Sequence, residues 1–367
     1  MPIRSFLLTL ALGAAAALAA PAVAQQAGGP SLAEITEAWL ASPHADRTAD
    51  AFTHWNDEED GMVPGRCAVC HTTQGAVDYM AGPMSTPGAI DHPVPIGQNV
   101  SCAACHAKGA AELTAVLFPS GVLVDALGTG SEATCAVCHQ GRAWGGTVDA
   151  AAEGMEADTV TADLSFINVH YTPAAATIMG GTAKGGYEYE GRDYKGTFTH
   201  VKDLATCTDC HSPHTLKPVP VAACASCHKE AEEYTDIRTS KVDFDGDGDV
   251  TEGIADPIAT LHGRLSDAIA AYATEVAGTA IVYGNAYPYF FIDTDADGAA
   301  GEGEAIYPNR YQTWTPRLLK AAYNYQFVKK DTGAHAHNPH YALQLLHDSL
   351  ADLGEAVDVD MAGLTRP

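Results

Sequence analysis

Five short motifs hold the residues of this chain whose types and spacing are best suited to chemistry. All ten cysteines lie in Cys-x-x-Cys pairs, and a histidine directly follows each pair. The five motifs consist of Cys67, Cys70 and His71; Cys102, Cys105 and His106; Cys135, Cys138 and His139; Cys207, Cys210 and His211; and Cys224, Cys227 and His228. With 16 histidines among 367 residues, this pattern has a chance probability on the order of one in ten million. The motifs therefore indicate one shared chemical function.

Three kinds of chemistry use paired cysteines. Disulfides within Cys-x-x-Cys pairs would be strained and redox-active, and they would not join distant segments. Zinc sites built from two motifs each would leave one motif unpaired and would not need the adjacent histidine. Covalent haem c uses every feature, because two thiols add to the two vinyl groups of one porphyrin and the histidine becomes the proximal iron ligand. The motifs therefore predict five covalently attached haem c groups.

The chain resembles the multihaem c-type cytochromes through CAVCH at 67–71, CAACH at 102–106, CAVCH at 135–139, CTDCH at 207–211 and CASCH at 224–228. The resemblance is most specific between residues 44 and 228. The motifs of the opening stretch look like the paired modules of cytochromes in respiratory and extracellular electron-transfer chains. The resemblance implies an electron-transfer protein.

A second histidine on the opposite porphyrin face would make each haem an electron carrier, whereas a single histidine would leave the iron open to substrates. Six histidines are candidates for this distal position: His44, His54, His170, His200, His214 and His337. His214 cannot face His211 across one iron because only three residues separate them, so we expect it to serve a neighbouring haem. His92 fits a turn better, His262 fits a helical core or a ligand equally well, and Met179 is a weaker alternative.

Two acidic loops have the spacing of calcium-binding loops. Residues 293–304, DTDADGAAGEGE, place Asp293, Asp295, Asp297 and Glu304 at ligand positions one, three, five and twelve, with a glycine at six. Residues 243–254 repeat the beginning of this pattern with Asp243, Asp245 and Asp247, but Ile254 occupies position twelve. We expect Ca²⁺ in these loops, with solvated acidic turns as the alternative reading.

The rest of the sequence predicts a mainly α fold with extensive irregular loops. Regular hydrophobic periods are sparse between residues 60 and 230, as expected where haem fills the interior. Capping signals predict helices near Ser31 and Glu34, over 256–278, from Thr315–Pro316 to about 327, and from Asn338–Pro339 to 353. The stretch 185–200 alternates aromatic and polar residues and predicts a short hairpin.

The organisation follows from these signals. Residues 1–24 read as a signal peptide cleaved near Ala24, residues 25–235 as the pentahaem cytochrome c region, and residues 236–367 as a helical region that carries the acidic loops. We predict a periplasmic or extracellular location and no integral membrane segment. The formal charge of −26 disfavours nucleic acid as a partner.

Three functional hypotheses remain. The first is a pentahaem electron carrier whose partners are redox proteins, such as a membrane quinol-oxidising complex or a terminal reductase. The second is a multihaem reductase of nitrite, hydroxylamine or a sulfur oxyanion with one open haem. The third is a subunit of a conductive filament, and homo-oligomerisation stays open. A carrier has no catalytic residue.

Overall fold

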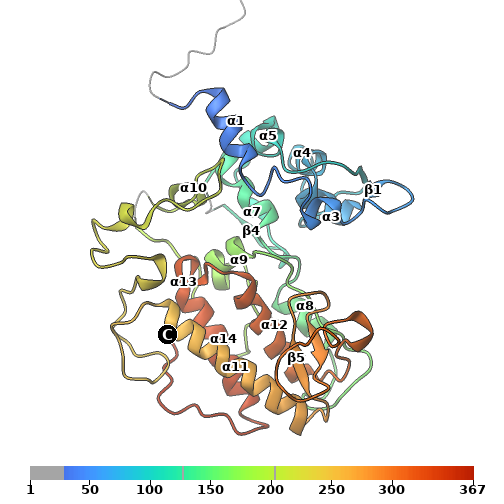
Figure 1. Cartoon of the computed structure of the whole chain (residues 1–367), viewed down its shortest axis with the longest axis vertical. Coiled ribbons are helices and arrows are strands. Elements are labelled where there is room, and N and C mark those ends of the chain that lie inside the picture. Colours follow the sequence, from blue (N-terminus) through green and yellow to red (C-terminus); the bar gives the residue numbers. More distant parts are fainter. Residues whose placement is uncertain (1–28, 126–127, 202–203) are drawn as a thin grey trace, which may run out of the picture.

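The protein is mostly helical, with long irregular connections and few short strands (Figure 1). A computed structural model describes residues 29–125, 128–201 and 204–367. The predicted signal peptide and its cleavage site near Ala24 lie outside the described residues. None of the helices within the described ranges is both long and apolar enough to cross a bilayer.

Three long helices of the C-terminal part form a bundle in the lower half of Figure 1: α11 (Ala255–Glu275), α12 (Pro316–Lys330) and α14 (Pro339–Leu353). Each of the three packs against the other two. Proline at the first position and a capping side chain fix the start of two of them, since Thr315 accepts from the amide of Leu318 and Asn338 accepts from that of Tyr341. These two starts confirm the sequence prediction.

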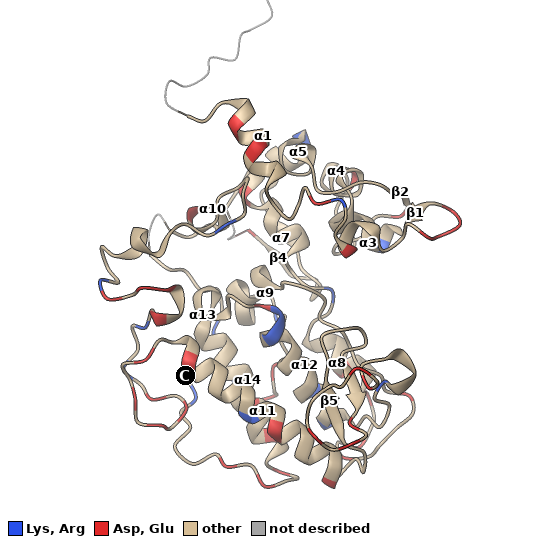
Figure 2. Cartoon of the chain, viewed as in Figure 1, with Lys and Arg blue, Asp and Glu red and all other residues tan. Residues whose placement is uncertain are grey.

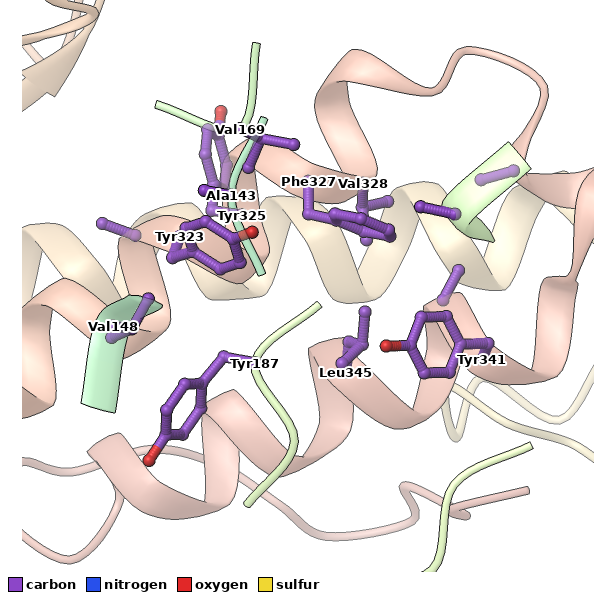
Figure 3. Packing of buried hydrophobic residues seen from close by; sticks show 14 of the residues in the cluster. Ala143, Val148, Val169, Tyr187, Tyr323, Tyr325, Phe327, Val328, Tyr341 and Leu345 are labelled. Atoms are coloured by element: carbon purple, nitrogen blue, oxygen red, sulfur yellow. The ribbon is translucent and has the colours of Figure 1, made fainter. Parts of the chain in front are cut away.

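The core of the bundle is aromatic and extends into the haem-motif part of the chain. Trp314, Tyr272, Tyr323 and Tyr341 are fully buried, and almost every residue of α12 is buried. Figure 3 shows Val148, Val169 and Tyr187 from the middle of the chain packed against side chains of α12 and α14. One hydrophobic cluster therefore supports both parts of the molecule.

The upper part of Figure 1 contains short helices joined by loops. Helices of four to nine residues carry or connect the motifs, and they have few turns to bury against one another. Their bounds are α1 (Leu32–Leu40), α2 (Asp50–Thr53), α3 (Gly65–His71), α4 (Thr73–Ala81), α5 (Cys102–His106), α6 (Lys108–Ala111), α7 (Thr134–Cys138), α8 (Gly145–Ala151), α9 (Ala174–Met179), α10 (Cys207–Cys210) and, beside the bundle, α13 (Ala334–His337).

Strands occur as three antiparallel pairs within the described ranges. β1 (Met62–Val63) pairs with β2 (Val94–Pro95), β3 (Val116–Leu117) with β4 (Leu123–Val124), and β5 (Ile281–Tyr283) with β6 (Phe290–Ile292). None of these ladders is long enough to organise the fold alone.

One local prediction was wrong. Residues 185–200 form no hairpin, because α12 and α14 satisfy their backbone: Asn324 bonds both backbone groups of Tyr187, and Gln344 accepts from the amide of Lys195. The tyrosines of this stretch pack on the bundle. The helix predicted over 256–278 is confirmed and runs from Ala255 to Glu275, but Asp256 does not cap it.

Acidic residues follow the loops of the C-terminal part, where they colour long stretches of chain red in Figure 2. One buried arginine of the bundle forms ion pairs with acidic residues of this surface. Arg317, 8% exposed, pairs with Asp158 at 2.7 Å, with Asp352 at 2.7 Å and with Glu355 at 3.1 Å. The loop around residue 158 is thereby fixed to α12 and α14.

Candidate haem centres

Each motif lies on a short helical turn. α3 and α5 each contain a whole motif, α7 and α10 contain the two cysteines of theirs, and the last motif begins at the end of a 3-10 helix, Val221–Cys224. Residues three apart lie on the same face of a helical turn, so both thiols of a motif face one side. That geometry suits attachment to the two vinyl groups of a single porphyrin.

Each motif histidine faces a second histidine from another segment. The rings of the five pairs have centroids 5.8 to 6.4 Å apart. The pairs are His71 with His170 at 5.8 Å, His106 with His214 at 6.3 Å, His139 with His44 at 6.3 Å, His211 with His337 at 6.4 Å, and His228 with His200 at 6.0 Å. Five of the six predicted distal candidates thus each lie opposite a different motif histidine.

These separations fit iron bound between the two rings. A metal bound at about 2.0 Å to one nitrogen of each imidazole places the two ring centroids roughly 6 Å apart. Histidines in direct contact would stand closer together than this. The chain therefore leaves between each pair the space that an iron with two axial histidines would take.

Hydrogen bonds orient several of the rings through Nδ1, leaving Nε2 for a metal. Four such contacts are His71 with the carbonyl oxygen of Ala51 at 2.7 Å, His139 with Thr172 Oγ1 at 2.9 Å, His211 with the carbonyl oxygen of Leu216 at 3.2 Å, and His337 with Asp331 Oδ1 at 2.8 Å. The sequence analysis missed these partners. Only Asp331, a carboxylate six residues before a candidate ligand, gave a signal that could have been noticed.

Burial keeps several of these histidines neutral, which is the form that binds metal. Burial lowers the pKa of His44 to about 4, and the neighbouring His139 adds to the shift. Burial likewise lowers the pKa of His170 to about 4, with Arg142 and His71 contributing. At neutral pH both rings can donate a lone pair.

The third motif lies among the others. Contact with Cys70 raises the pKa of the Cys138 thiol well above its usual range, with burial next. The pKa of the Cys135 thiol is also raised, mainly by contact with Cys207 and next by burial. Cys105 of the second motif is also close enough to act on the pKa of Cys138. The first, second and fourth motifs therefore adjoin the third.

Two curated proteins are similar to this chain. The chain is 29% identical over 365 residues to the C-type polyheme cytochrome OmcB of Geobacter sulfurreducens, and the match covers 83% of the chain and 46% of that protein. It is 29% identical over 375 residues to the C-type polyheme cytochrome OmcC of the same organism, covering 87% of the chain and 46% of OmcC. Both proteins are named as C-type polyheme cytochromes, and the five motifs make this chain similar to that family.

The chain spans about half the length of these relatives. No protein-family model matches it, and the comparison with solved structures gave no significant match.

Three of the remaining histidines of the chain have other partners. His54 packs edge-on against Trp55 at 4.8 Å, and Trp55 lies between it and His71. Among the described contacts His54 faces no motif histidine, so it is the candidate left over. His262 bonds the carbonyl oxygen of Tyr325 at 3.0 Å and stacks on that ring, while His92 pairs with Asp91 and Asp78. His262 is thus a core histidine.

Each of the two acidic loops brings its carboxylates together. One oxygen from each of Asp293, Asp295, Asp297 and Glu304 lies within 4.8 Å of the others, and the same holds for Asp243, Asp245 and Asp247. Gly298 and Gly248, at position six of each loop, have φ of +76° and +86°, which a side chain would resist. Each loop holds one buried carboxylate oxygen without a hydrogen-bond partner, Oδ1 of Asp245 and Oδ1 of Asp293. Asp245 is 1% exposed, and Glu304 of the other loop accepts from Thr294 and Gly301.

Proposed function

We propose that the chain is an exported pentahaem electron carrier in which every iron is held by two histidines. The pairing of all five motif histidines with a second histidine carries this proposal. When bound, haem supplies a one-electron ferric–ferrous couple. The chain would contribute the ten thiols that attach it, the ten imidazoles that close both axial positions, and the backbone and side-chain acceptors that orient them.

Two axial imidazoles exclude substrate from an iron, and this supports a carrier over a reductase. A reductase would need one motif histidine without an opposing ligand, and each of the five, all within the described ranges, faces one. No Cys-x-x-Cys-Lys motif, which some nitrite reductases use at the active haem, occurs in the sequence. A filament subunit that borrows a distal histidine from its neighbour is disfavoured by the same pairing.

The contacts among motifs support relay within the chain. The third motif adjoins the first, second and fourth, and the fourth and fifth lie close enough for Cys224 to act on the pKa of Cys210, after burial and Asp209. We infer a connected group of redox sites with the third at its centre. The partners would be redox proteins on either side of this relay, in the periplasm or outside the cell.

A ferric spin-state survey tests the proposal. Electron paramagnetic resonance and near-infrared spectra of the whole protein should show five low-spin haems and no binding of cyanide or nitrite. Replacement of one distal candidate, His214→Ala, should convert one haem to high spin without loss of covalent haem.

His54→Ala is the matched control, because His54 is also near a motif but faces Trp55. It should leave all five haems low-spin. A high-spin haem in the unaltered protein, or an unchanged spectrum for His214→Ala, contradicts the proposal.

We also propose calcium as a second cofactor, bound in the loop at residues 243–254. Burial raises the pKa of Asp245, so its unpartnered oxygen is costly unless a cation approaches. The loop is anchored around it: Arg264 donates to the carbonyl oxygen of Asp245 at 3.1 Å, and the amide of Thr365 donates to that of Phe244 at 3.1 Å. Oxygen ligands on a fixed loop suit Ca²⁺. The complete pattern at Asp293, Asp295, Asp297 and Glu304 stays a prediction.

Calcium titration tests this second cofactor. At millimolar calcium, an extracellular-type site would stabilise the fold by about 1 kcal/mol. Chelation should lower Tm, and Asp245→Asn should remove one bound Ca²⁺ and part of that shift. Asp295→Asn, in the loop at residues 293–304, is the control, and it should leave the calcium site at Asp245 intact. Equal calcium stoichiometry in the Asp245→Asn protein and the wild type would refute the site.

A further inference from the structure

One candidate haem ligand differs from the others in what holds its second nitrogen. Nδ1 of His337 lies 2.8 Å from Oδ1 and 2.9 Å from Oδ2 of Asp331. The other acceptors described above are two carbonyl oxygens and a threonine hydroxyl, all uncharged. Among the ten histidines of the five pairs, all of which the structure describes, only His337 contacts a carboxylate.

The fold fixes this carboxylate in place. Asp331 follows the last residue of α12 and precedes α13, which carries His337. It is 4% exposed, and its Oδ1 also accepts from the amide of Gly333 at 3.1 Å. Both carboxylate oxygens lie within hydrogen-bond distance of Nδ1 of His337. The fold therefore presents a buried carboxyl group to this ring.

This carboxyl group lies beside the centre of the motif group. Asp331, His337 and His211 are all close enough to His139 to act electrostatically on its ring. The third and fourth histidine pairs are thus neighbours, with Asp331 close to both. Of these two histidine pairs, only the fourth has a ring, that of His337, in hydrogen-bond contact with Asp331.

A carboxylate that accepts the Nδ1 proton of a ligand imidazole gives the ring imidazolate character and makes Nε2 a stronger donor. A stronger donor and a nearby negative charge in a dry site both stabilise ferric over ferrous iron. The stronger donation by Nε2 and the nearby negative charge therefore both lower the reduction potential of the iron. They act most strongly on the iron that His337 would bind.

We propose that Asp331 sets the potential of the haem between His211 and His337 and makes it the most reducing of the five. This inference rests on the proposed haem ligation. Asp331 is a positioning and tuning residue that acts through His337 and touches no substrate. Its role would be to create a potential step at the junction of the third and fourth sites.

The test is a redox titration of the intact holoprotein, followed by visible absorbance and ferric electron paramagnetic resonance. In Asp331→Asn, one haem should become easier to reduce: at a fixed potential its ferric-to-ferrous ratio should fall about tenfold, which corresponds to about 59 mV for one electron. The shifted component should be the lowest-potential one of the unaltered protein, and its ferric signal should move.

Asp348→Asn is the matched control, because Asp348 is buried on the bundle and contacts His347 at 3.3 Å, which faces no motif histidine among the described contacts. It should leave all five potentials unchanged. If Asp331→Asn also leaves the potentials unchanged, or shifts a higher-potential haem instead, the tuning role is wrong.

His337→Ala separates this failure from failure of the ligation itself. A new high-spin haem in His337→Ala, together with unchanged potentials in Asp331→Asn, would overturn only the tuning role. Five low-spin haems in His337→Ala would overturn the fourth pair and with it the inference. If His337→Ala and Asp331→Asn change the spectrum of the same haem and of no other, both the ligation by His337 and the tuning by Asp331 are supported.

Discussion

The haem-motif part and the helical bundle bury their interiors by different means. The bundle of α11, α12 and α14 buries Trp314, Tyr323 and leucine side chains along whole helices. The motif part consists of short helices, and its paired histidines come from segments far apart in the chain, as with His44 and His139 or His211 and His337. Side-chain packing would hold one part, and metal ligation would hold the other.

The bundle also reaches into the motif part. α8 packs against α12, α9 packs against α13, and α13 supplies His337. The bundle is therefore a base on which ligand-bearing segments are fixed. The comparison predicts that damage to a haem site and damage to the bundle core produce separable defects.

Removal of the central attachment site should have the largest effect. The double change Cys135→Ser and Cys138→Ser should remove one haem and loosen the first, second and fourth motifs, because the third motif adjoins them. Amides of α12 should stay protected from hydrogen exchange. The control, Cys224→Ser with Cys227→Ser, also removes one haem but at the edge of the group, so loss of protection should stay local. Equal loss in both variants would contradict the central position.

Truncation of a side chain in the bundle core should have the second-largest effect. Trp314→Ala removes a fully buried side chain and should lower the free energy of unfolding by about 3–5 kcal/mol, measured by denaturant titration. Haem content and spin state should not change. Tyr307→Ala, at a residue 55% exposed, is the control and should cost far less. A high-spin haem in Trp314→Ala would show that the two parts are not separable.

The free energy of unfolding at acid pH tests the charge of Asp348 in the bundle. Burial would raise the pKa of Asp348, but bonds from His347, Arg366 and Tyr194 lower it to about 2 from 3.8. A lowered carboxyl pKa gives stability that is present above pH 3.8 and is lost as pH falls toward 2. Asp348→Asn should cost about 2 kcal/mol at neutral pH. The cost should shrink below pH 4; a pH-independent cost would contradict the charge argument.

The smallest expected effect is spectroscopic and concerns ring orientation. The imidazole planes are nearly parallel in the pairs His44–His139 and His106–His214, at 22° and 23°, but crossed at 73° in His71–His170. Crossed ligand planes bring the iron d orbitals close in energy and give a ferric low-spin signal with a large maximum g value. That signal should disappear in His170→Ala and persist in His44→Ala.

Local sequence rules predicted much of the bundle and the list of candidate ligands. The caps at Thr315 and Asn338 and the capping box of Ser31 and Glu34 are confirmed because each is a short-range arrangement. The pairing of His170 with His71 could not be read from spacing, since it depends on how distant segments meet. The hairpin predicted at 185–200 failed for the same reason: side chains of α12 and α14 replace the cross-strand hydrogen bonds.

The intact mass of the purified protein tests the central claim most directly. Ten cysteines in five motifs predict a mass equal to the polypeptide plus five haem groups, with no free thiol and no disulfide. Fewer than five haem additions, or thiols that react with an alkylating reagent, would contradict the account of a chain organised by five covalently bound haems.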